Sequence, residues 1–465
     1  MAFIGREKEL NLLLDCFNSN SLRVILIKGR RRIGKSELIR EAIHRFFKDK
    51  SIYFQATDSN LNFNLSFLSS VLRESLFHDS RGYVTLEDAL EDVFRYSLKE
   101  KIVFVIDEYP YLRNSFNEKN YLDSLLQRLV DKYKNDSKLK LIIAGSSTRI
   151  MSSIGEKGND LYGRVTDSIT LTGMDYYEAA EFYPNYNNEN KLLAYSVFGG
   201  SPFYASLVDD SKSVKENAIN QILSKSIVLS SPIDILSQEL KNLALANSIF
   251  QLISTGTHKF NDLLTKIGNV SVSSFNYTLK ALEEMGIIRK ITPINKEQDK
   301  RKTFYDLDDF FLRFYYRYLF RNLSSLSMMN YEQFYETFVL EDLEREYLPK
   351  AFEEITRQYF VRKNKEGSFN PPFINIGKYW YNDPLHKKNG EFDVVAKNAK
   401  GRYLFMECKY AKAKLNESDL LYEIQQVKDL GFKDIDYGFC SRSGYAFSDD
   451  NKPNAMLLTL DDLYK

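Results

Sequence analysis

The stretch that decides the fold reads Leu22-Arg23-Val24-Ile25-Leu26-Ile27-Lys28, followed by Gly29-Arg30-Arg31-Arg32-Ile33-Gly34-Lys35-Ser36-Glu37. The first half is an apolar run of strand length, and the second half fits the phosphate-binding loop pattern G-x4-G-K-S/T. A helical pattern over residues 36–47 follows, so strand, loop and helix occur in the order that this motif requires. A chance glycine turn before a helix is the less favoured alternative.

We expect this loop to bind the phosphates of ATP. Glycines let the backbone close round a phosphate and aim N–H groups at its oxygens, at the N-terminus of a helix. Lys35 would reach the β- and γ-phosphates as a catalytic residue, and the Ser36 hydroxyl would bind Mg²⁺. The predicted nucleotide-binding residues of the loop are Gly29, Arg30, Arg31, Arg32, Ile33, Gly34, Lys35, Ser36 and Glu37.

A second motif lies further along the chain, where an apolar strand over residues 102–106 ends in Asp107-Glu108. Ligands of α/β sheets bind at the carboxyl ends of strands, which is where Asp107 would lie. We expect Asp107 to hold Mg²⁺ through water and Glu108 to act as the general base for the attacking water. An acidic pair that only ends a strand and caps a helix is the minority interpretation after such a loop.

Two further residues are candidates for contact with the γ-phosphate. Ser146 follows the apolar run over residues 139–144, and a plain helix N-cap is an equally good interpretation of it. Arg164, in Leu161-Tyr162-Gly163-Arg164, could sense the charge of the γ-phosphate, and a surface salt bridge is its alternative.

The pattern of the chain predicts an α/β multidomain protein. Apolar β-branched runs alternate with helical stretches up to residue 172, which is typical of a doubly wound parallel sheet. The later segments read as helical, then as a small separate unit, then as an aromatic-rich helical stretch, then as α/β again. The predicted domains are an ATPase core at 1–172, a helical lid at 173–240, a winged helix-turn-helix at 241–308, a helical connector at 309–350 and a nuclease-like domain at 351–465.

The segment 241–308 combines three short helical patterns with two strands, the arrangement of a winged helix. A recognition helix starting near Ser273 would expose Ser274, Asn276, Tyr277 and Lys280, and the turn after the first strand carries Lys296, Lys300, Arg301 and Lys302 for contact with phosphates. Winged helices also bind proteins or act as lids, and Glu283 and Glu284 on the same helix oppose DNA contact. DNA binding and protein binding therefore both stay open here.

The C-terminal segment carries the spacing D-x13-E-x-K, in Asp393, Glu407 and Lys409. Residues i and i+2 of a strand share a face, so Glu407 and Lys409 would project together. Asp393 and Glu407 could then share a divalent cation such as Mg²⁺, and Lys409 could activate a water molecule for phosphodiester cleavage. Glu353 or Glu354, on a predicted helix at 351–359, could complete the acidic cluster.

Composition excludes several classes of protein. The 465 residues are 43% hydrophobic and 27% charged, which is typical of a globular chain, and the length predicts several domains. The 64 basic and 63 acidic residues leave a net charge of +1, so overall charge indicates no polyanionic partner. No apolar run approaches the roughly 20 residues of a membrane-spanning helix, residues 1–10 lack an apolar signal core, and three cysteines form no disulfide framework. We expect a cytoplasmic protein.

The motifs together resemble a known family. The segments Phe3-Ile4-Gly5-Arg6-Glu7, the loop at 29–36, Asp107-Glu108-Tyr109-Pro110-Tyr111-Leu112, Gly145-Ser146-Ser147, Leu161–Arg164 and Gly199-Gly200-Ser201-Pro202-Phe203-Tyr204 resemble the archaeal-type ATPases of the STAND branch of AAA-like P-loop proteins. The resemblance implies a parallel sheet with an extra strand between the P-loop strand and the strand that ends at Asp107, then a helical lid whose Gly-x-Pro segment faces the nucleotide. Members of this family often work as slow nucleotide switches.

The last part of the chain resembles the domain of unknown function that accompanies these ATPases. Trp380, Glu391, Asp393 and Glu407-Cys408-Lys409 carry this resemblance, which implies a restriction-endonuclease-like PD-(D/E)xK fold. Phe392 stands where the motif has proline. We predict an ATPase coupled through a winged helix to a DNA-facing, nuclease-like domain, with ATP, Mg²⁺ and DNA as ligands, no membrane partner, and homo-oligomerisation left open. The alternatives are an ATP-dependent DNA-binding regulator without nuclease activity and a protein-interaction switch.

Overall fold

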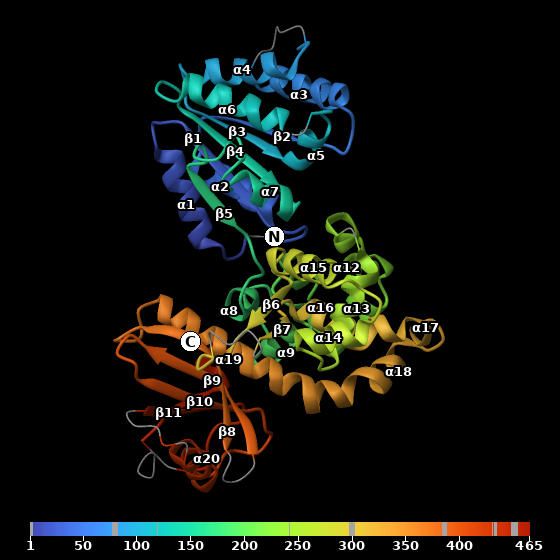
Figure 1. The fold of residues 1–465 in the computed structure, drawn as a ribbon, viewed down its shortest axis with the longest axis vertical. Helices are drawn as coiled ribbons and strands as arrows, with labels where there is room; N and C mark the ends of the chain where they lie inside the picture. The colour runs from blue at the N-terminus through green and yellow to red at the C-terminus, as the bar shows by residue number, and fades with distance from the viewer. Residues whose placement is uncertain are drawn as a thin grey trace. The chain divides into compact units, whose positions relative to one another are not determined.

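The chain forms two compact units, seen in a computed structural model (Figure 1). The structure describes residues 3–76, 82–118, 120–240, 242–296, 303–383, 388–429, 431, 435–447 and 454–465. Unit 1 comprises Met1–Gly173 with the short segments Ser201–Phe203 and Ile235–Lys241. Unit 2 comprises Met174–Gly200, Tyr204–Asp234 and Asn242–Lys465.

Unit 1 is built on a five-stranded parallel sheet in the order β2-β3-β4-β1-β5. The strands are β1 (Arg23–Lys28), β2 (Lys50–Gln55), β3 (Ile102–Asp107), β4 (Leu139–Gly145) and β5 (Asp167–Thr170). Every residue of β3 and β4 is buried, because helices cover both faces of a parallel sheet. The strand β4 lies between β1 and β3, which confirms the extra strand that the family resemblance implied.

Alternate residues of β1 enter two different cores on the two faces of this sheet. Val24 and Leu26 pack in the core that includes α3 (Leu61–Ser75), α4 (Leu86–Tyr96), α5 (Tyr109–Asn114), α6 (Tyr121–Tyr133) and α7 (Thr148–Ile154). Ile25 and Ile27 pack in the core that includes α1 (Glu7–Asn18) and α2 (Lys35–Phe46). The predicted doubly wound parallel sheet is therefore confirmed for this part of the chain.

Helices dominate the segment that follows β5. They are α8 (Tyr176–Ala180), α9 (Asn188–Phe198), α10 (Pro202–Ala205), α11 (Val214–Asn217) and α12 (Ser226–Glu239). Three more helices, α13 (Leu243–Ser254), α14 (Phe260–Ile267) and α15 (Val272–Glu284), precede an antiparallel hairpin of β6 (Ile288–Ile291) and β7 (Phe304–Leu307). The order of these elements is the one the sequence predicted for residues 241–308.

The aromatic-rich stretch is helical, as expected, and leads into one long helix. Its elements are α16 (Phe310–Phe314), α17 (Leu323–Leu326), α18 (Tyr331–Tyr335), α19 (Leu348–Lys365), and π-helical segments at Tyr315–Leu319, Glu336–Leu340 and Leu343–Tyr347. The boundary expected after residue 350 falls inside α19.

The chain ends in a second five-stranded sheet, in the order β12-β11-β10-β9-β8. Its strands are β8 (Phe373–Asp383), β9 (Lys388–Asn398), β10 (Tyr403–Lys409), β11 (Ile435–Ser441) and β12 (Met456–Thr459), with α20 (Glu417–Asp429) and α21 (Leu460–Leu463). The pairs β8–β9 and β9–β10 are antiparallel, whereas β10–β11 and β11–β12 are parallel. Helix α19 contacts β8, β9 and β10, so it packs on this mixed sheet.

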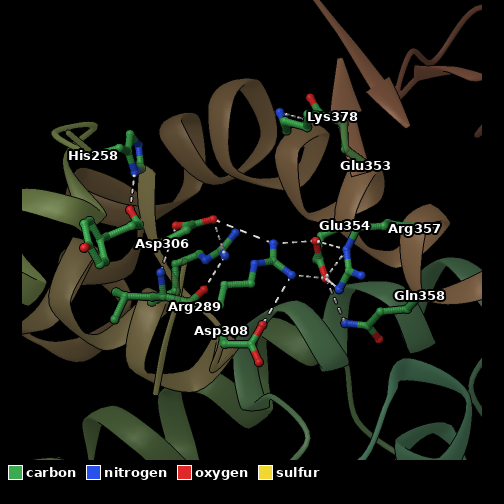
Figure 2. A network of polar contacts seen from close by, with 12 residues as sticks. His258, Arg289, Asp306, Asp308, Glu353, Glu354, Arg357, Gln358 and Lys378 are labelled. Carbon is green, nitrogen blue, oxygen red and sulfur yellow. Dashed lines mark hydrogen bonds and ion pairs between the residues drawn. The ribbon is translucent and has the colours of Figure 1, made fainter. Parts of the chain in front are cut away.

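A buried ion-pair network joins the β6–β7 hairpin to α19 within unit 2 (Figure 2). The Glu354 carboxylate, 7% exposed, accepts hydrogen bonds at 2.6 Å from Arg289 of β6 and at 2.6 Å from Arg357 of its own helix. Asp308, just after β7, lies 3.3 Å from Arg289. Burial alone would raise the pKa of Glu354, but the two guanidinium groups hold that pKa well below its usual range.

We predict that Glu354→Ala lowers the free energy of unfolding by about 3–5 kcal/mol, because it leaves two half-buried guanidinium groups without their shared, buried carboxylate. Chemical denaturation followed by circular dichroism measures the change. Glu341→Ala is the matched control: its carboxylate pairs with Arg345 on an exposed helix surface, so its loss should change stability by no more than about 0.5 kcal/mol. Equal effects of the two substitutions would contradict the prediction.

Candidate functional site

The loop at residues 29–34 joins β1 to α2 and requires glycine at two positions. A Cβ atom on Gly29 would lie 2.6 Å from the carbonyl oxygen of Leu171, so no side chain fits there. Gly34, the N-cap of α2, has φ of 91°, a left-handed conformation that favours glycine. The first N–H groups of α2 therefore stand at the mouth of a closely wound loop, which is a favourable environment for an anion.

Lys35 turns its ammonium group back into this loop. The side chain is buried, and Nζ donates to the carbonyl oxygens of Gly29 at 2.8 Å and Arg30 at 3.1 Å. A buried ammonium group beside the start of a helix supplies the positive charge that phosphates need. The loop thus fits the polyphosphate of a nucleotide.

Asp107 brings the two predicted magnesium ligands together. The carboxylate is buried at the end of β3, and its Oδ2 accepts hydrogen bonds from Ser36 Oγ at 2.7 Å and from Tyr53 OH at 2.5 Å. Burial, and then the negative charge of Asp107, raise the pKa of Tyr53, so this phenol stays a hydrogen-bond donor. A hydroxyl and a carboxylate are oxygen ligands of the kind Mg²⁺ prefers, so the residues fit this ion.

Tyr53 was not expected from the sequence. It lies on β2, which pairs in parallel with β3 so that Gln55 is opposite Asp107 and Tyr53 is opposite Val105. Its side chain reaches the carboxylate from the neighbouring strand, and the guanidinium carbon of Arg40 lies 4.9 Å from the centre of its ring. The signal in the sequence was weak: a tyrosine between the two apolar residues of a short strand, Ile52 and Phe54.

Glu108 and Ser146 are in direct contact at the ends of β3 and β4. Ser146 donates to Glu108 Oε2 from Oγ at 2.8 Å and from its backbone N–H at 3.2 Å. The N-cap of α7 is Ser147, so the alternative interpretation of Ser146 as a plain helix N-cap is wrong. Glu108 itself has φ of 51°, a strained conformation for a residue with a side chain. The predicted base is thus held at the same sheet edge as Asp107.

Arg31, Arg32 and Arg164, which were predicted to bind nucleotide, contact side chains of the protein itself. Arg31 donates to the hydroxyl of Tyr111, and the guanidinium carbon of Arg32 lies 4.3 Å from the ring centre of Phe203. Ser201 Oγ donates to the carbonyl oxygen of Arg32 at 2.8 Å. Arg164 pairs with Asp131 at 3.0 Å, the surface ion pair that was its alternative interpretation. Its contact with a γ-phosphate stays a prediction.

A second group of predicted residues meets on β9 and β10 in unit 2. Asp393 Oδ2 accepts from the backbone N–H of Cys408 at 3.0 Å. Burial, and then the charges of Glu353 and Glu407, raise the pKa of Asp393 well above its usual value. Burial also raises the pKa of Glu407, although Lys409 opposes the shift. These effects show that Asp393 and Glu407 are close enough to interact electrostatically.

Lys409 lies between two carboxylates. Its Nζ donates to Glu407 Oε1 at 2.8 Å and to Glu423 Oε1 of α20 at 2.9 Å. Sequence reasoning missed Glu423, because nothing in the chain indicates how α20 lies on the sheet.

Neither of the two glutamates expected to supply a third carboxylate is free, because both pair with cationic side chains. Glu354 is bound by Arg289 and Arg357, and Glu353 pairs with Lys378 at 3.0 Å (Figure 2). In the described part of the chain, no group of three or more His, Cys, Asp or Glu side chains could hold a metal ion. The pair Asp393 and Glu407 nevertheless suits Mg²⁺, which commonly takes one or two carboxylates and keeps several waters.

The surface predicted to face DNA is described only in part. Asn276, Tyr277 and Lys280 are exposed on α15, Ser274 is half-buried, and Lys280 lies 3.6 Å from Glu284. Lys296 is exposed after β6. Lys300, Arg301 and Lys302 lie outside the described residues.

Fold and site together define the class: residues of unit 1 form an ATPase-like P-loop domain. Residues 3–208 match the family described as "ATPase domain predominantly from Archaea". Residues 315–420 match the family described as "Archaea bacterial proteins of unknown function". Both matches agree with the resemblances drawn from the motifs, and the first supports ATP hydrolase activity.

The chain is also similar to a curated relative and to solved structures of other proteins. An uncharacterized protein of Methanocaldococcus jannaschii is 28% identical over 431 residues, which are 90% of each chain. The Walker-type ATPase of Pyrococcus abyssi has a TM-score of 0.51 at 17% identity, over 68% of this chain and 96% of that one. The ORC2 protein of Aeropyrum pernix, as its ADPNP-ADP complexes, has a TM-score of 0.43 at 14% identity, over 65% and 89%. At these identities the structural likeness concerns the fold alone. No helix in the described ranges could cross a membrane.

We predict that Lys35→Ala weakens ATP binding at least about tenfold while the protein stays folded, because a charge-assisted hydrogen bond contributes about 1.5–3 kcal/mol. Titration calorimetry measures the affinity, and circular dichroism checks the fold. Lys48→Ala, at an exposed lysine just after α2, is the matched control and should bind ATP as the unmodified chain does. Unchanged ATP affinity in a folded Lys35→Ala variant would remove Lys35 from the site.

Proposed function

We propose that the chain binds and hydrolyses ATP as a slow nucleotide switch, coupled through a winged helix to a DNA-facing, nuclease-like domain. The observation that carries the ATPase half is the contact of Ser36 with Asp107 beside the buried ammonium group of Lys35. The proposed parts are an ATPase core at 1–172, a lid at 173–240, a winged helix at 241–308, a connector at 309–350 and a nuclease-like domain at 351–465.

The protein's own groups divide the work of ATP hydrolysis. On nucleotide binding, Lys35 exchanges the carbonyl oxygens of Gly29 and Arg30 for phosphate oxygens, and the N–H groups of the loop and of α2 hold the remaining charge. Ser36 and Asp107 would hold Mg²⁺, which would supply positive charge beside the phosphates. Tyr53 keeps the Asp107 carboxylate in place when the Ser36 hydroxyl turns away from it.

Glu108 is the proposed general base. One oxygen of its carboxylate would accept the proton of the attacking water. The other oxygen, Oε2, accepts the two hydrogen bonds from Ser146. Ser146 would thereby orient the Glu108 carboxylate, and its hydroxyl would lie beside the γ-phosphate. Arg164 would have to leave Asp131 before it could contact a phosphate, so we assign it no role in the chemical step.

We predict that Glu108→Gln retains ATP binding but lowers the rate of hydrolysis by about 10²- to 10⁴-fold, since the amide keeps the shape and loses the basic oxygen. Phosphate release under saturating ATP and Mg²⁺ measures the rate. Glu87→Gln, at an exposed carboxylate that pairs with Arg128, should leave the rate unchanged. A wild-type rate in Glu108→Gln would assign the base to another group.

For the C-terminal domain, we propose that Asp393 and Glu407 hold a divalent cation and that Lys409 orients water for cleavage of a phosphodiester. The raised pKa values of both carboxyl groups support this, because a cation would relieve the cost of their buried charge. The exposed polar residues of α15 and the adjoining hairpin support DNA as the partner. Lys409, however, is held by Glu407 and Glu423, which favours the alternative of an ATP-dependent DNA-binding regulator without cleavage.

We predict that Mn²⁺ raises the melting temperature of the full chain and that Asp393→Asn abolishes this rise. Because the folded-state pKa of Asp393 is raised, its contribution to stability is complete below the unfolded pKa and is lost as pH rises through the folded pKa. Without metal, Asp393→Asn should therefore melt about 2–4 °C above wild type near pH 8 and lose this advantage toward pH 4.

Scanning calorimetry at both pH values measures these shifts. The control is Asp436→Asn, which changes an exposed carboxylate paired with Arg402 on the same sheet and should keep the response to Mn²⁺. A response to Mn²⁺ that survives in Asp393→Asn would reject the cation site. Lys409→Ala should keep the response but lose any metal-dependent nicking of plasmid DNA.

A further inference from the structure

Unit 2 contains a pocket of about 410 Å³ that connects the β6–β7 hairpin to the proposed cleavage site. Its lining includes Lys290 of β6, Phe304 of β7, Lys350 of α19, Trp380 of β8 and Asp393 of β9. The volume lies within the roughly 300–1,000 Å³ of small-ligand sites, so one nucleotide unit fits and a base-paired duplex does not.

Aromatic side chains form one part of the pocket wall. The rings of Phe304 and Trp380 have centroids 4.2 Å apart at an interplanar angle of 69°. Trp380 Nε1 donates to Glu391 at 2.9 Å, and Asn295 donates to the carbonyl oxygen of Trp380 at 2.7 Å. The indole is therefore held by Glu391 and by the ring of Phe304, while Asn295 fixes the backbone of Trp380. Fixed aromatic rings beside cationic groups are the usual surface on which single-stranded nucleic acids stack their bases.

The charges of the lining favour an anionic ligand in spite of its carboxylates. Seven Lys and Arg side chains line the pocket against five Asp and Glu side chains. Most of these carboxylates have a cationic partner. Arg289 and Arg357 bind Glu354 (Figure 2), and Lys378 binds both Glu353 and Glu391.

Two cations stand out from the rest of the lining. Lys290 and Lys350 are exposed, and the described residues include no hydrogen-bond or ion-pair partner for either. Asp393 is the one lining carboxylate without a cationic hydrogen-bond partner among the described residues. The charge of the other four is offset by arginine or lysine, which leaves Lys290 and Lys350 to bind a phosphate.

We propose that this pocket admits one strand of DNA, with a base against Trp380 and Phe304 and the backbone against Lys290 and Lys350, so that the substrate is single-stranded or frayed DNA rather than intact duplex. This inference rests on the proposed function, since it gives the substrate class of the site at Asp393. The backbone would then pass from the hairpin to the carboxylates of β9 and β10.

Trp380 is the single tryptophan of the sequence, so its fluorescence reports on this pocket directly. We expect a short oligodeoxythymidine strand, added to the full chain in EDTA, to quench the fluorescence with saturation. A hairpin duplex of the same length should bind at least about tenfold more weakly, because its bases are not free to stack. Quenching by thymidine monophosphate with the same affinity as the strand, or by the duplex with the same affinity, would overturn the proposal.

Variants test the same contacts with a labelled strand and fluorescence anisotropy. Trp380→Ala should weaken binding about 5- to 100-fold, whereas Trp380→Phe, which keeps an aromatic ring, should lose less. Tyr422→Ala, at an exposed ring on α20 outside the pocket lining, is the control and should bind as wild type. Lys290→Ala and Lys350→Ala should each lower the slope of log affinity against log salt by about 0.7. Slopes unchanged in both lysine variants would overturn the backbone contact.

The two proposals fail in different ways. Saturable quenching by the strand, with no cleavage of any DNA in Mg²⁺ or Mn²⁺, supports the pocket and rejects the nuclease. Cleavage of intact duplex that leaves the fluorescence of Trp380 unchanged supports the nuclease and rejects the pocket.

Discussion

A hydrogen bond of 2.7 Å from Ser36 to Asp107 joins the first turn of α2 to the end of β3. It forms only because β1, β4 and β3 pair in parallel, so that their carboxyl ends reach the same edge of the sheet. The same pairing brings Ser146, at the end of β4, against Glu108. The positions of the loop at residues 29–34, of the proposed magnesium ligands and of the proposed base thus follow from one sheet edge.

In unit 2, the carboxylate of Glu354 has a comparable role. It binds one arginine from the β6–β7 hairpin and one from its own helix, and that helix packs on the C-terminal sheet. A buried charge with two good partners fixes relative position, since any other arrangement leaves at least one charge unpaired. The pocket beside it has hairpin residues on one wall and sheet residues on another, so its shape depends on this network.

The sequence allowed the central strands of unit 1 to be predicted, because β3 and β4 are buried on both faces and β1 is apolar along most of its length. The motifs assigned Ser36 and Asp107 to the same Mg²⁺, and the structure brings the two side chains into direct contact. Tyr53 could not be predicted, since its role depends on the register of β2 against β3, which short apolar runs do not specify. The predicted roles of residues in the nucleotide site remain predictions, because no nucleotide contact has been observed.

In the C-terminal domain, the sequence predicted the contacts of some residues and not of others. The spacing of Asp393, Glu407 and Lys409 predicted side chains that meet, and their contacts and shared electrostatics agree. Glu354 was a reasonable candidate for the same cluster from its position on a helix. Its actual partner, Arg289, lies far away in the chain, and a pairing of that kind leaves no periodic signal.

The backbone of Glu108 has a consequence for how this position can vary. A left-handed conformation costs a residue with a side chain on the order of 1 kcal/mol, and the surrounding strand and helix must hold it there. Glycine at this position would relax the backbone, but it would also remove the carboxylate that accepts two hydrogen bonds from Ser146. Because each such bond contributes about 0.5–1.5 kcal/mol, the strain of Glu108 is offset by its own side chain, and glycine would bring no gain in stability.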